Sequence, residues 1–295
     1  MSLGAALAMS GERSLRNLCS RCFPSAPEDT TMDHPALTND LAATLESGGV
    51  ALGLLDNTYS PTLGEFYGEL DMDFVWIDLE HGGPDPWDAN LMEDLLRAAE
   101  RTDLELLVRL PDTDPTLVRK ALDLGARNVF LPRVETATEV REAIKSARFR
   151  YDDGTGERGL GSPRARRWGL ADDYIATEDR ETIVGVTIET EASVENLDAI
   201  LDVPELGFVF IGSLDLSVSL GCPGEIDHPD VQEAVETVRS KAVDVGVPVG
   251  GLGFGMNDVN EKAANGYQML NLGSTTGALE QTVTGWFDVY EQNDA

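Results

Sequence analysis

Short apolar stretches rich in Val, Ile, Leu and Phe alternate with amphipathic helical patterns from residue 38 onward. Within each apolar stretch, few polar residues interrupt the apolar ones, which is typical of parallel strands buried on both faces. The clearest stretch runs FVWIDLEHGG, because its strand ends in a carboxylate, an imidazole and two glycines. Eight strands are predicted: Val50–Leu54, Phe74–Leu79, Leu104–Leu110, Asn128–Val134, Ile183–Glu189, Phe208–Gly212, Pro248–Leu252 and Gln268–Leu272.

Eight predicted helices follow these strands, and one more precedes them at Thr38–Ser47. They are Pro61–Leu70, Trp87–Arg101, Pro115–Gly125, Ala137–Arg148, Ser193–Leu201, Pro229–Val245, Asn257–Asn265 and Ala278–Gln292. Eight strands that alternate with eight helices over about 250 residues are what a (β/α)8 barrel, or TIM barrel, contains. A doubly wound sheet usually has a glycine-rich phosphate turn after its first strand, where this chain has LDNTYSPT. We therefore predict an α/β fold, a single (β/α)8 barrel with an additional N-terminal helix over residues 38–295.

Residues 1–37 differ from the rest of the chain, because they contain three arginines and few acids. We interpret them as a disordered extension or as the result of a start codon assigned too early. Cys19 and Cys22 form a single C-x2-C pair there, which does not complete a tetrahedral zinc site. The third cysteine, Cys222, is interpreted as structural.

The chain has 53 acidic and 22 basic residues and a formal charge of −31. Nucleic acids and anionic membranes would be repelled, so neither is expected as a partner. The sequence contains no run of 18 apolar residues, the length needed to span a membrane. It also shows no basic region typical of a secretory signal, so we expect a cytoplasmic protein. The acids are spread along the chain and only four basic residues are lysines, which indicates adaptation to high salt.

Polar side chains stand at the C-terminal ends of several predicted strands. Glu80 and His81 follow the second strand, Arg109 ends the third, Glu189 ends the fifth and Asp215 follows the sixth. Each one alone also fits a helix cap or a solvated loop residue. Because a barrel gathers these strand ends on one face, their joint placement favours a shared active site.

The residue types narrow the chemistry of such a site. All four lysines lie inside predicted helices, which disfavours Schiff-base catalysis. His34 and His228 lie away from strand ends, which disfavours a zinc site with several histidines. Glu189 and Asp215 suit a hard divalent ion such as Mg²⁺ or Mn²⁺. Arg109 could bind an anionic oxygen, and His81 could transfer a proton. Together with a metal ion, these two residues predict proton abstraction next to a carbonyl.

Six arginines between residues 148 and 167 form what we term the Arg cluster. In so acidic a chain, we interpret it as an anion site or a subunit contact rather than a solvated face. Its members are Arg148, Arg150, Arg158, Arg164, Arg166 and Arg167.

The ordered motifs of the chain resemble those of the HpcH/HpaI aldolase family over about residues 38–290. They are IDLEHGG, VRLPDTDP, ALDLGARNVFLPRVET, RGLGSPRARRWG, TIETEASVENLDAILDVPELGFVFIGSLDLSVSLG and NLGSTTGAL. The family comprises class II pyruvate-dependent aldolases, including 4-hydroxy-2-oxoheptanedioate and 2-keto-3-deoxy-L-rhamnonate aldolases. The resemblance implies metal-dependent cleavage of a 4-hydroxy-2-oxo or 2-keto-3-deoxy acid to pyruvate and an aldehyde, through a metal-bound pyruvate enolate.

The resemblance also implies roles for individual residues. Glu189 and Asp215 match the ligands of the divalent metal, which would be Mg²⁺ or Mn²⁺, with Co²⁺ as an alternative. Arg109 matches the residue that holds the carbonyl or enolate oxygen of pyruvate. His81 matches the catalytic histidine, and Asp123 matches its acidic partner.

Further expectations from the resemblance concern substrate binding and assembly. The segment Gly212, Ser213 and Leu214 is implied to bind the substrate, with backbone amides up to Asp215 holding the pyruvate carboxylate. A homo-oligomer is implied, a hexamer built as a trimer of dimers, in which the last helix packs on a neighbouring subunit. The apolar residues compatible with that contact are Trp286, Phe287 and Tyr290.

Two departures from the family pattern leave the acceptor aldehyde open. Members often have Gln where this chain has Thr187, and Pro-Ala or Pro-Asn where it has Ser213-Leu214. Two other functions also remain open at this point. One is a CoA-thioester lyase of the malyl-CoA or citramalyl-CoA type, for which only the Arg cluster offers a site for the polyanionic cofactor. The other is a non-catalytic barrel.

Salt adaptation predicts that the melting temperature rises steeply between low and molar KCl. The Debye length falls to about 3 Å at 1 M salt, so repulsion among the carboxylates is then screened. Circular dichroism melting curves across a KCl series test this, and a flat profile would refute it.

Overall fold

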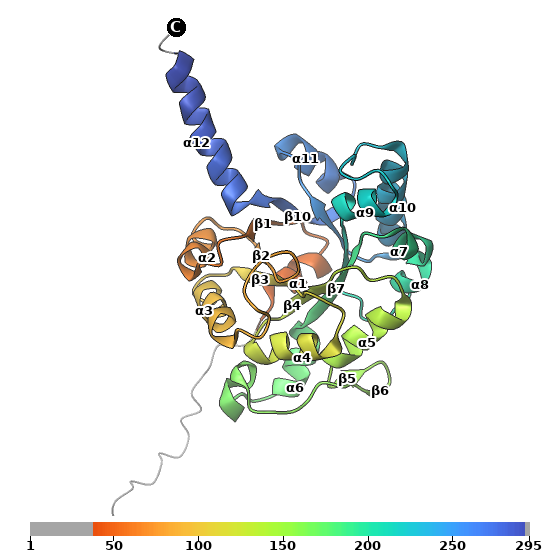
Figure 1. Ribbon diagram of the computed structural model, residues 1–295. Coiled ribbons are helices and arrows are strands. Elements are labelled where there is room, and N and C mark those ends of the chain that lie inside the picture. Colours follow the sequence, from red (N-terminus) through yellow and green to blue (C-terminus); the bar gives the residue numbers. More distant parts are fainter. Residues whose placement is uncertain (1–37, 293–295) are drawn as a thin grey trace, which may run out of the picture. The chain divides into compact units, whose positions relative to one another are not determined.

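The computed structural model describes residues 38–292, and the predicted extension over residues 1–37 lies outside them. Within the described part, eight parallel strands close into a barrel in the order β1-β10-β9-β8-β7-β4-β3-β2, with helices around it (Figure 1). The (β/α)8 prediction is therefore confirmed. The strands are β1 (Ala51–Asp56), β2 (Phe74–Asp78), β3 (Glu105–Arg109), β4 (Asn128–Leu131), β7 (Ile183–Ile188), β8 (Phe208–Ile211), β9 (Val249–Leu252) and β10 (Tyr267–Ser274).

Helix boundaries follow the local signals in the sequence. In α4, Pro115 occupies the first turn and Gly125 ends the helix with φ 115°, a conformation that favours glycine. None of the described helices is long and apolar enough to cross a membrane. The helices are α1 (Asp40–Glu46), α2 (Pro61–Gly68), α3 (Ala89–Ala99), α4 (Pro115–Leu124), α5 (Ala137–Ala147), α6 (Tyr174–Glu181), α7 (Glu191–Glu195), α8 (Leu197–Leu201), α9 (Ser213–Ser219), α10 (Pro229–Val245), α11 (Met256–Ala264) and α12 (Thr275–Gln292).

Aromatic rings fill the inside of the barrel. The ring of Trp76 packs edge-on against those of Phe130 and Phe210, each with its centroid 5.3 Å away. Glycines on neighbouring strands make room for these rings, since a Cβ on Gly250 would lie 2.6 Å from the Phe210 ring. A Cβ on Gly185 would lie 2.3 Å from the ring of Phe208. The interior is thus a packed core, and only the rim at the strand ends is open for chemistry.

The structure adds elements that the sequence patterns did not predict. The expected loop at residues 150–170 contains a hairpin of β5 (Arg150–Tyr151) and β6 (Gly154–Thr155) and a 3-10 helix, η2 (Arg164–Gly169). The predicted helix Ser193–Leu201 is divided into α7 and α8 at Asn196. Helix α9 follows β8 directly and was not among the predicted helices. The helices among these elements are short, so each has too few turns to show a helical period in the sequence.

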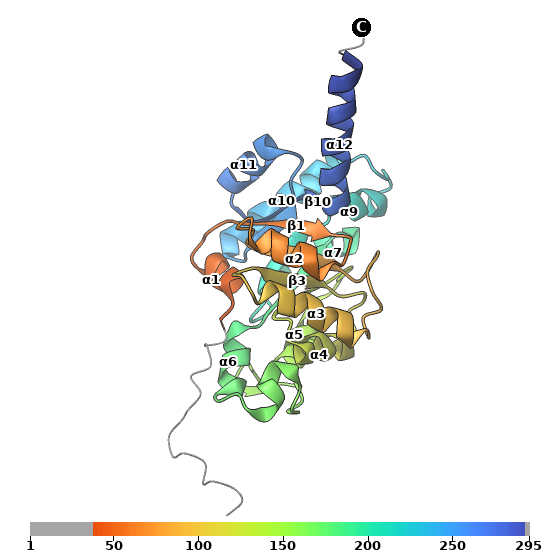
Figure 2. The same ribbon diagram turned by 90° about the vertical axis from the view of Figure 1, so that its left-hand side faces the viewer.

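The Arg cluster lies on the segment that leads from α5 back to β7, at the N-terminal end of the strands. Figure 2 shows α1 and α6 on one side of the barrel and α9 on the other. Arg148 pairs with Glu205 at 2.6 Å. Arg164 pairs with Glu100 at 2.6 Å and donates to the carbonyl of Leu124. These arginines therefore attach their segment to the barrel, far from the rim where the active site was predicted.

Arg158 is a member of the Arg cluster whose side chain is almost completely buried. Its guanidinium donates to Glu178 at 2.8 Å and to the hydroxyl of Tyr174 at 3.0 Å, and the side chains of Arg158 and Glu178 are each only 1% exposed. Glu178 also accepts from Arg127 at 3.1 Å. Glu178 in α6 thus forms ion pairs with two arginines at once.

Glu178→Gln should therefore destabilise the fold by about 3–5 kcal/mol, because it leaves Arg158 as a buried charge without its counter-ion. The free energy of unfolding, measured by denaturant titration in molar KCl, tests this. Glu157→Gln is the matched control, since its ion pair with Lys145 lies on the surface and should contribute little. Equal effects of the two substitutions would contradict the expectation.

Candidate active site

Arg109, at the end of β3, is held by two carboxylates. Its Nε and Nη2 donate to the two oxygens of Asp78 at 2.8 and 2.7 Å, and its Nη1 lies 2.9 Å from Glu80 Oε2. The guanidinium also stacks over the ring of Trp76, 4.8 Å from its centroid. Asp78 and Arg109 occupy paired positions on β2 and β3, so the register of these strands brings them together. Arg109 holds the pKa of Asp78 below its usual value, although burial opposes this.

Glu80 and His81 occupy the turn after β2, as predicted. The side chain of Glu80 is 10% exposed and that of His81 is 59% exposed, with Glu80 Oε2 3.7 Å from His81 Nε2. Burial raises the pKa of Glu80, while Arg109 and His81 counteract this effect. Glu80 is therefore an acidic neighbour of His81 within the same chain.

Glu189 follows β7 and is almost completely buried. Its Oε1 accepts the backbone N–H of Arg133 at 2.5 Å. The pKa of Glu189 is raised to about 7, chiefly by burial; Glu80 and Asp215 contribute to the rise, and the Arg133 N–H and Arg109 oppose it. Such a carboxylate needs a positive charge close by to remain ionised at neutral pH.

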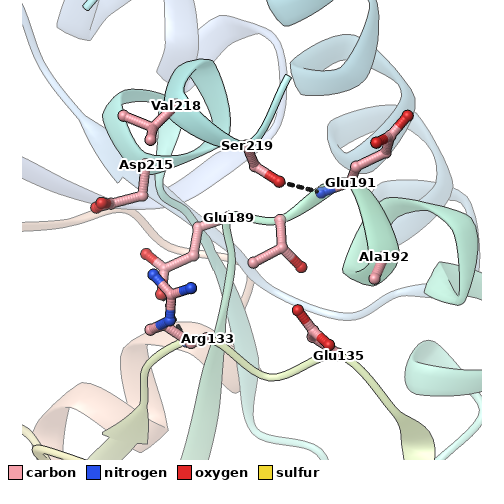
Figure 3. A pocket seen from close by; sticks show the side chains of 9 residues that line it. Arg133, Glu135, Glu189, Glu191, Ala192, Asp215, Val218 and Ser219 are labelled. Carbon is pink, nitrogen blue, oxygen red and sulfur yellow. Dashed lines mark hydrogen bonds between the residues drawn. The ribbon is translucent and has the colours of Figure 1, made fainter. Parts of the chain in front are cut away.

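Asp215 lies in the first turn of α9 and shares a cavity of about 290 Å³ with Glu189 (Figure 3). This cavity, termed the rim cavity below, lies between the turn after β4, α7 and α9. Gly212 precedes α9 with no room for a side chain, because a Cβ there would lie 2.7 Å from Glu189 Oε2. The close approach of β8 to β7 thus brings the two predicted metal ligands to one place. The lining residues are Arg133, Glu135, Glu189, Thr190, Glu191, Ala192, Asp215, Val218 and Ser219.

The residues around Glu189 and Asp215 fit a hard divalent ion. Within residues 38–292, no three His, Cys, Asp or Glu side chains gather as a metal-ligand group, so water and substrate oxygens would complete the coordination, as is common for Mg²⁺. Thr187 lies two residues before Glu189 on the same face of β7. Its buried hydroxyl has no hydrogen-bond partner in the described chain, and a water or substrate oxygen beside Glu189 would supply one.

Asp123 is not brought to this rim. It lies in the last turn of α4, at the opposite end of the barrel from His81. Burial raises its pKa, and Arg158 and Lys120 lower it. An Asp123–His81 pair is therefore not formed within one chain, and its role as the acidic partner stays a prediction.

The sequence reasoning missed two residues of the site. Asp78 interrupts the apolar run of β2 at its last residue, and this interruption was the available signal. Arg133 stands after Pro132, where the predicted strand was extended too far, to Val134. The structure ends β4 at Leu131, so Arg133 lies in the turn beyond the strand.

A sequence model of the family "HpcH/HpaI aldolase/citrate lyase" matches residues 53–281. The chain belongs to this family. It is 34% identical to a 2-keto-3-deoxy-L-rhamnonate aldolase of Klebsiella pneumoniae over 68% of this chain and 73% of that one. It is 33% identical to a hydroxypyruvate/pyruvate aldolase of Roseobacter denitrificans over 73% of this chain and 83% of that one.

Among solved structures, an HpcH/HpaI aldolase/citrate lyase family protein of Burkholderia cenocepacia aligns with a TM-score of 0.81 at 29% identity. The alignment covers 86% of this chain and 100% of that one. The predictions of the family, of the barrel and of an enzyme of the aldolase class are thus confirmed. Of the HpcH/HpaI motifs recognised in the sequence, IDLEHGG and VRLPDTDP reach the strand ends that build the rim, as do the segments around Glu189 and Asp215. The motif RGLGSPRARRWG lies in the Arg cluster, at the other end of the barrel.

The raised pKa of Glu189 predicts that metal affinity depends on pH. Below about pH 7 a proton competes with the ion for Glu189, so the Kd for Mn²⁺ should rise about tenfold for each unit of pH decrease and level off above pH 7. Calorimetric titration between pH 5.5 and 8.5 measures this.

Two variants test the assignment of the metal to Glu189. Glu189→Gln should lose metal-dependent activity and the pH dependence of binding while staying folded. Glu191→Gln, an exposed carboxylate of the same cavity, should bind Mn²⁺ nearly as the wild type does. A pH-independent Kd, or retained activity of Glu189→Gln, would refute the assignment.

Proposed function

We propose that this protein is a cytoplasmic, divalent-metal-dependent aldolase. It would cleave a 4-hydroxy-2-oxo or 2-keto-3-deoxy acid to pyruvate and an aldehyde and also catalyse the reverse addition. The observation that most supports this is the placement of Glu189 and Asp215 in one cavity, on the same rim as Arg109 and His81. The aldolase names of the relatives support the reaction class.

Glu189 and Asp215 are the proposed ligands of the ion, as the resemblance implied. When bound, a divalent cation supplies Lewis-acid polarisation of a carbonyl oxygen, which acidifies the adjacent carbon. Glu189 is oriented for this role by the Arg133 N–H. Its burial also keeps bulk water from competing with the substrate.

Arg109 is proposed to bind the oxygen on which negative charge develops. A guanidinium has five N–H donors, and three contacts of Arg109 go to Asp78 and Glu80. About two donors therefore remain for the substrate. Because Asp78 and Trp76 fix the guanidinium plane, little reorganisation is needed when charge appears on the oxygen.

The first turn of α9 is proposed to bind the carboxylate of pyruvate. Gly212 at its N-terminus has no side chain to cap the first amides, so the amides of Ser213 and Leu214 can donate to an anion. This assignment agrees with the substrate-binding segment that the resemblance implied.

His81 is proposed to transfer the proton. In the cleavage direction, its imidazole would accept the proton of the 4-hydroxyl while the bond between carbons 3 and 4 breaks. Glu80, 3.7 Å from Nε2, would stabilise the protonated ring. The exposure of His81 gives it access to a substrate that enters from solvent.

We also propose a homo-oligomer, with the hexamer as the expected form. Helix α12 stands away from the barrel in Figures 1 and 2, and Trp286, Phe287 and Tyr290 on it are each at least 60% exposed. Packing on another copy would cover them. Only in such an assembly could Asp123 approach His81, and then that of a different copy.

A CoA-thioester lyase has no comparable support in the structure. The Arg cluster was the proposed site for its polyanionic cofactor. In a single chain this cluster lies at the opposite end of the barrel from the rim cavity, and Arg148, Arg158 and Arg164 are already paired with carboxylates.

The proposed function predicts that the enzyme exchanges the methyl protons of pyruvate with D2O. The exchange should require Mn²⁺ or Mg²⁺ and should stop with excess EDTA, because it reports proton abstraction next to the carbonyl. Proton NMR in molar KCl follows it without knowledge of the aldehyde. Absence of exchange with every divalent metal would overturn the proposed function.

A further inference from the structure

Arg133 occupies a constrained position beside the proposed metal ligands. It has φ 52°, a left-handed conformation that arginine seldom adopts and that is often found where surrounding structure demands it. Its N–H donates to Glu189 at 2.5 Å, and the buried Pro132 precedes it. The backbone of Arg133 is therefore held in place, and its side chain starts from a fixed point on the rim.

The side chain of Arg133 lines the rim cavity and is exposed to it (Figure 3). Every other charged residue that lines this cavity is acidic: Glu135, Glu189, Glu191 and Asp215. Among residues 38–292, the Arg133 guanidinium has neither an ion pair within 4.0 Å nor a hydrogen bond. It is thus the one cation that lines this cavity, and no carboxylate oxygen of the described residues lies within 4.0 Å of its nitrogens.

The proposed ion would balance the two metal ligands next to Arg133, and Arg109 has carboxylate partners of its own. Glu189 and Asp215 carry two negative charges, which a divalent cation balances. Arg109 is balanced by Asp78 and Glu80 and does not line the rim cavity. Beyond the metal ligands, the charged groups that line the cavity are then the carboxylates of Glu135 and Glu191 and one cation, Arg133.

We propose that Arg133 determines specificity by binding an anionic group at the far end of the substrate. The favoured aldehydes would carry a carboxylate or a phosphate ester remote from the reacting carbonyl. A guanidinium binds both groups through paired, charge-assisted hydrogen bonds. Glu135 and Glu191 line the same cavity and would repel the anionic group from their own positions. The substrate would therefore bind only in the orientation that brings this group to Arg133. This inference rests on the proposed aldolase function and names its substrate class.

The test compares kcat and KM for the addition of pyruvate to three aldehydes. Succinic semialdehyde carries a carboxylate, glyceraldehyde 3-phosphate carries a phosphate, and butanal is uncharged. The wild type should prefer at least one charged aldehyde over butanal by on the order of tenfold or more in kcat/KM. In Arg133→Gln that preference should fall about 10- to 100-fold, mainly through KM, because a charged hydrogen-bonded pair is lost.

Two further variants separate recognition from a structural effect. Arg133→Lys retains the charge without the planar fork and should recover part of the preference. Arg141→Gln on α5 is the matched control, because Arg141 is also exposed and has no ion pair within the described residues; it should retain the wild-type preference. The charged aldehyde that loses most in Arg133→Gln identifies the anion as carboxylate or phosphate.

Three results would overturn the inference. The first is a wild type that uses butanal as well as both charged aldehydes. The second is an equal loss for charged and neutral aldehydes in Arg133→Gln, which would mean that Arg133 only supports Glu189. The third is absence of pyruvate proton exchange in the wild type, which would overturn the proposed function as well. Exchange in the wild type with no charge preference would overturn this inference alone.

Discussion

Closure of the barrel is the constraint on which the rest of the structure depends. Eight parallel strands can close only if side chains fill the interior, and here aromatic rings face glycines on adjacent strands. Closure places every strand end on a common rim. Residues separated by more than 130 positions, such as Asp78 and Asp215, thereby come to one site.

Charge balance then determines what this rim can do. The buried carboxylates of Asp78 and Glu80 are neutralised in part by Arg109. Among the described residues Glu189 has no ion-pair partner within 4.0 Å, and its pKa rises to about 7. A buried carboxylate of this kind is costly to the fold unless a cation or a proton accompanies it. This is the physical reason for proposing that the ion binds here and not among the many exposed acids of the surface.

The two arginine populations of the chain show how similar residues take different roles. At the N-terminal end of the barrel, Arg148, Arg158 and Arg164 pair with carboxylates and attach a long connecting segment to the body. At the other end, Arg133 is unpaired in the described chain and lies beside a cavity. Whether an arginine is paired with a carboxylate, and not how densely arginines occur in the sequence, separates the structural role from the proposed recognition role.

Much of the architecture was predictable from local patterns. The apolar runs and the Pro and Gly signals of α4 predicted the strands, the helices and the barrel, because backbone preference and burial act over a few residues. Strand-end positions also predicted that Glu189 and Asp215 would meet, since the barrel topology carries that information. The family resemblance added the reaction class but could not place Asp123, which lies away from His81 within one chain.

By itself, the sequence determined the alternation of barrel strands and main helices, the acidic character of the protein and the identity of several rim residues, among them Glu189 and Asp215. Only the tertiary structure decided which charges are paired. It joined Asp78 to Arg109 through strand register and left Arg133 facing the cavity. It also placed three members of the Arg cluster in structural ion pairs, namely Arg148, Arg158 and Arg164. The physical reason is that ion pairing depends on distances of a few ångströms between residues far apart in the chain, which no local pattern encodes.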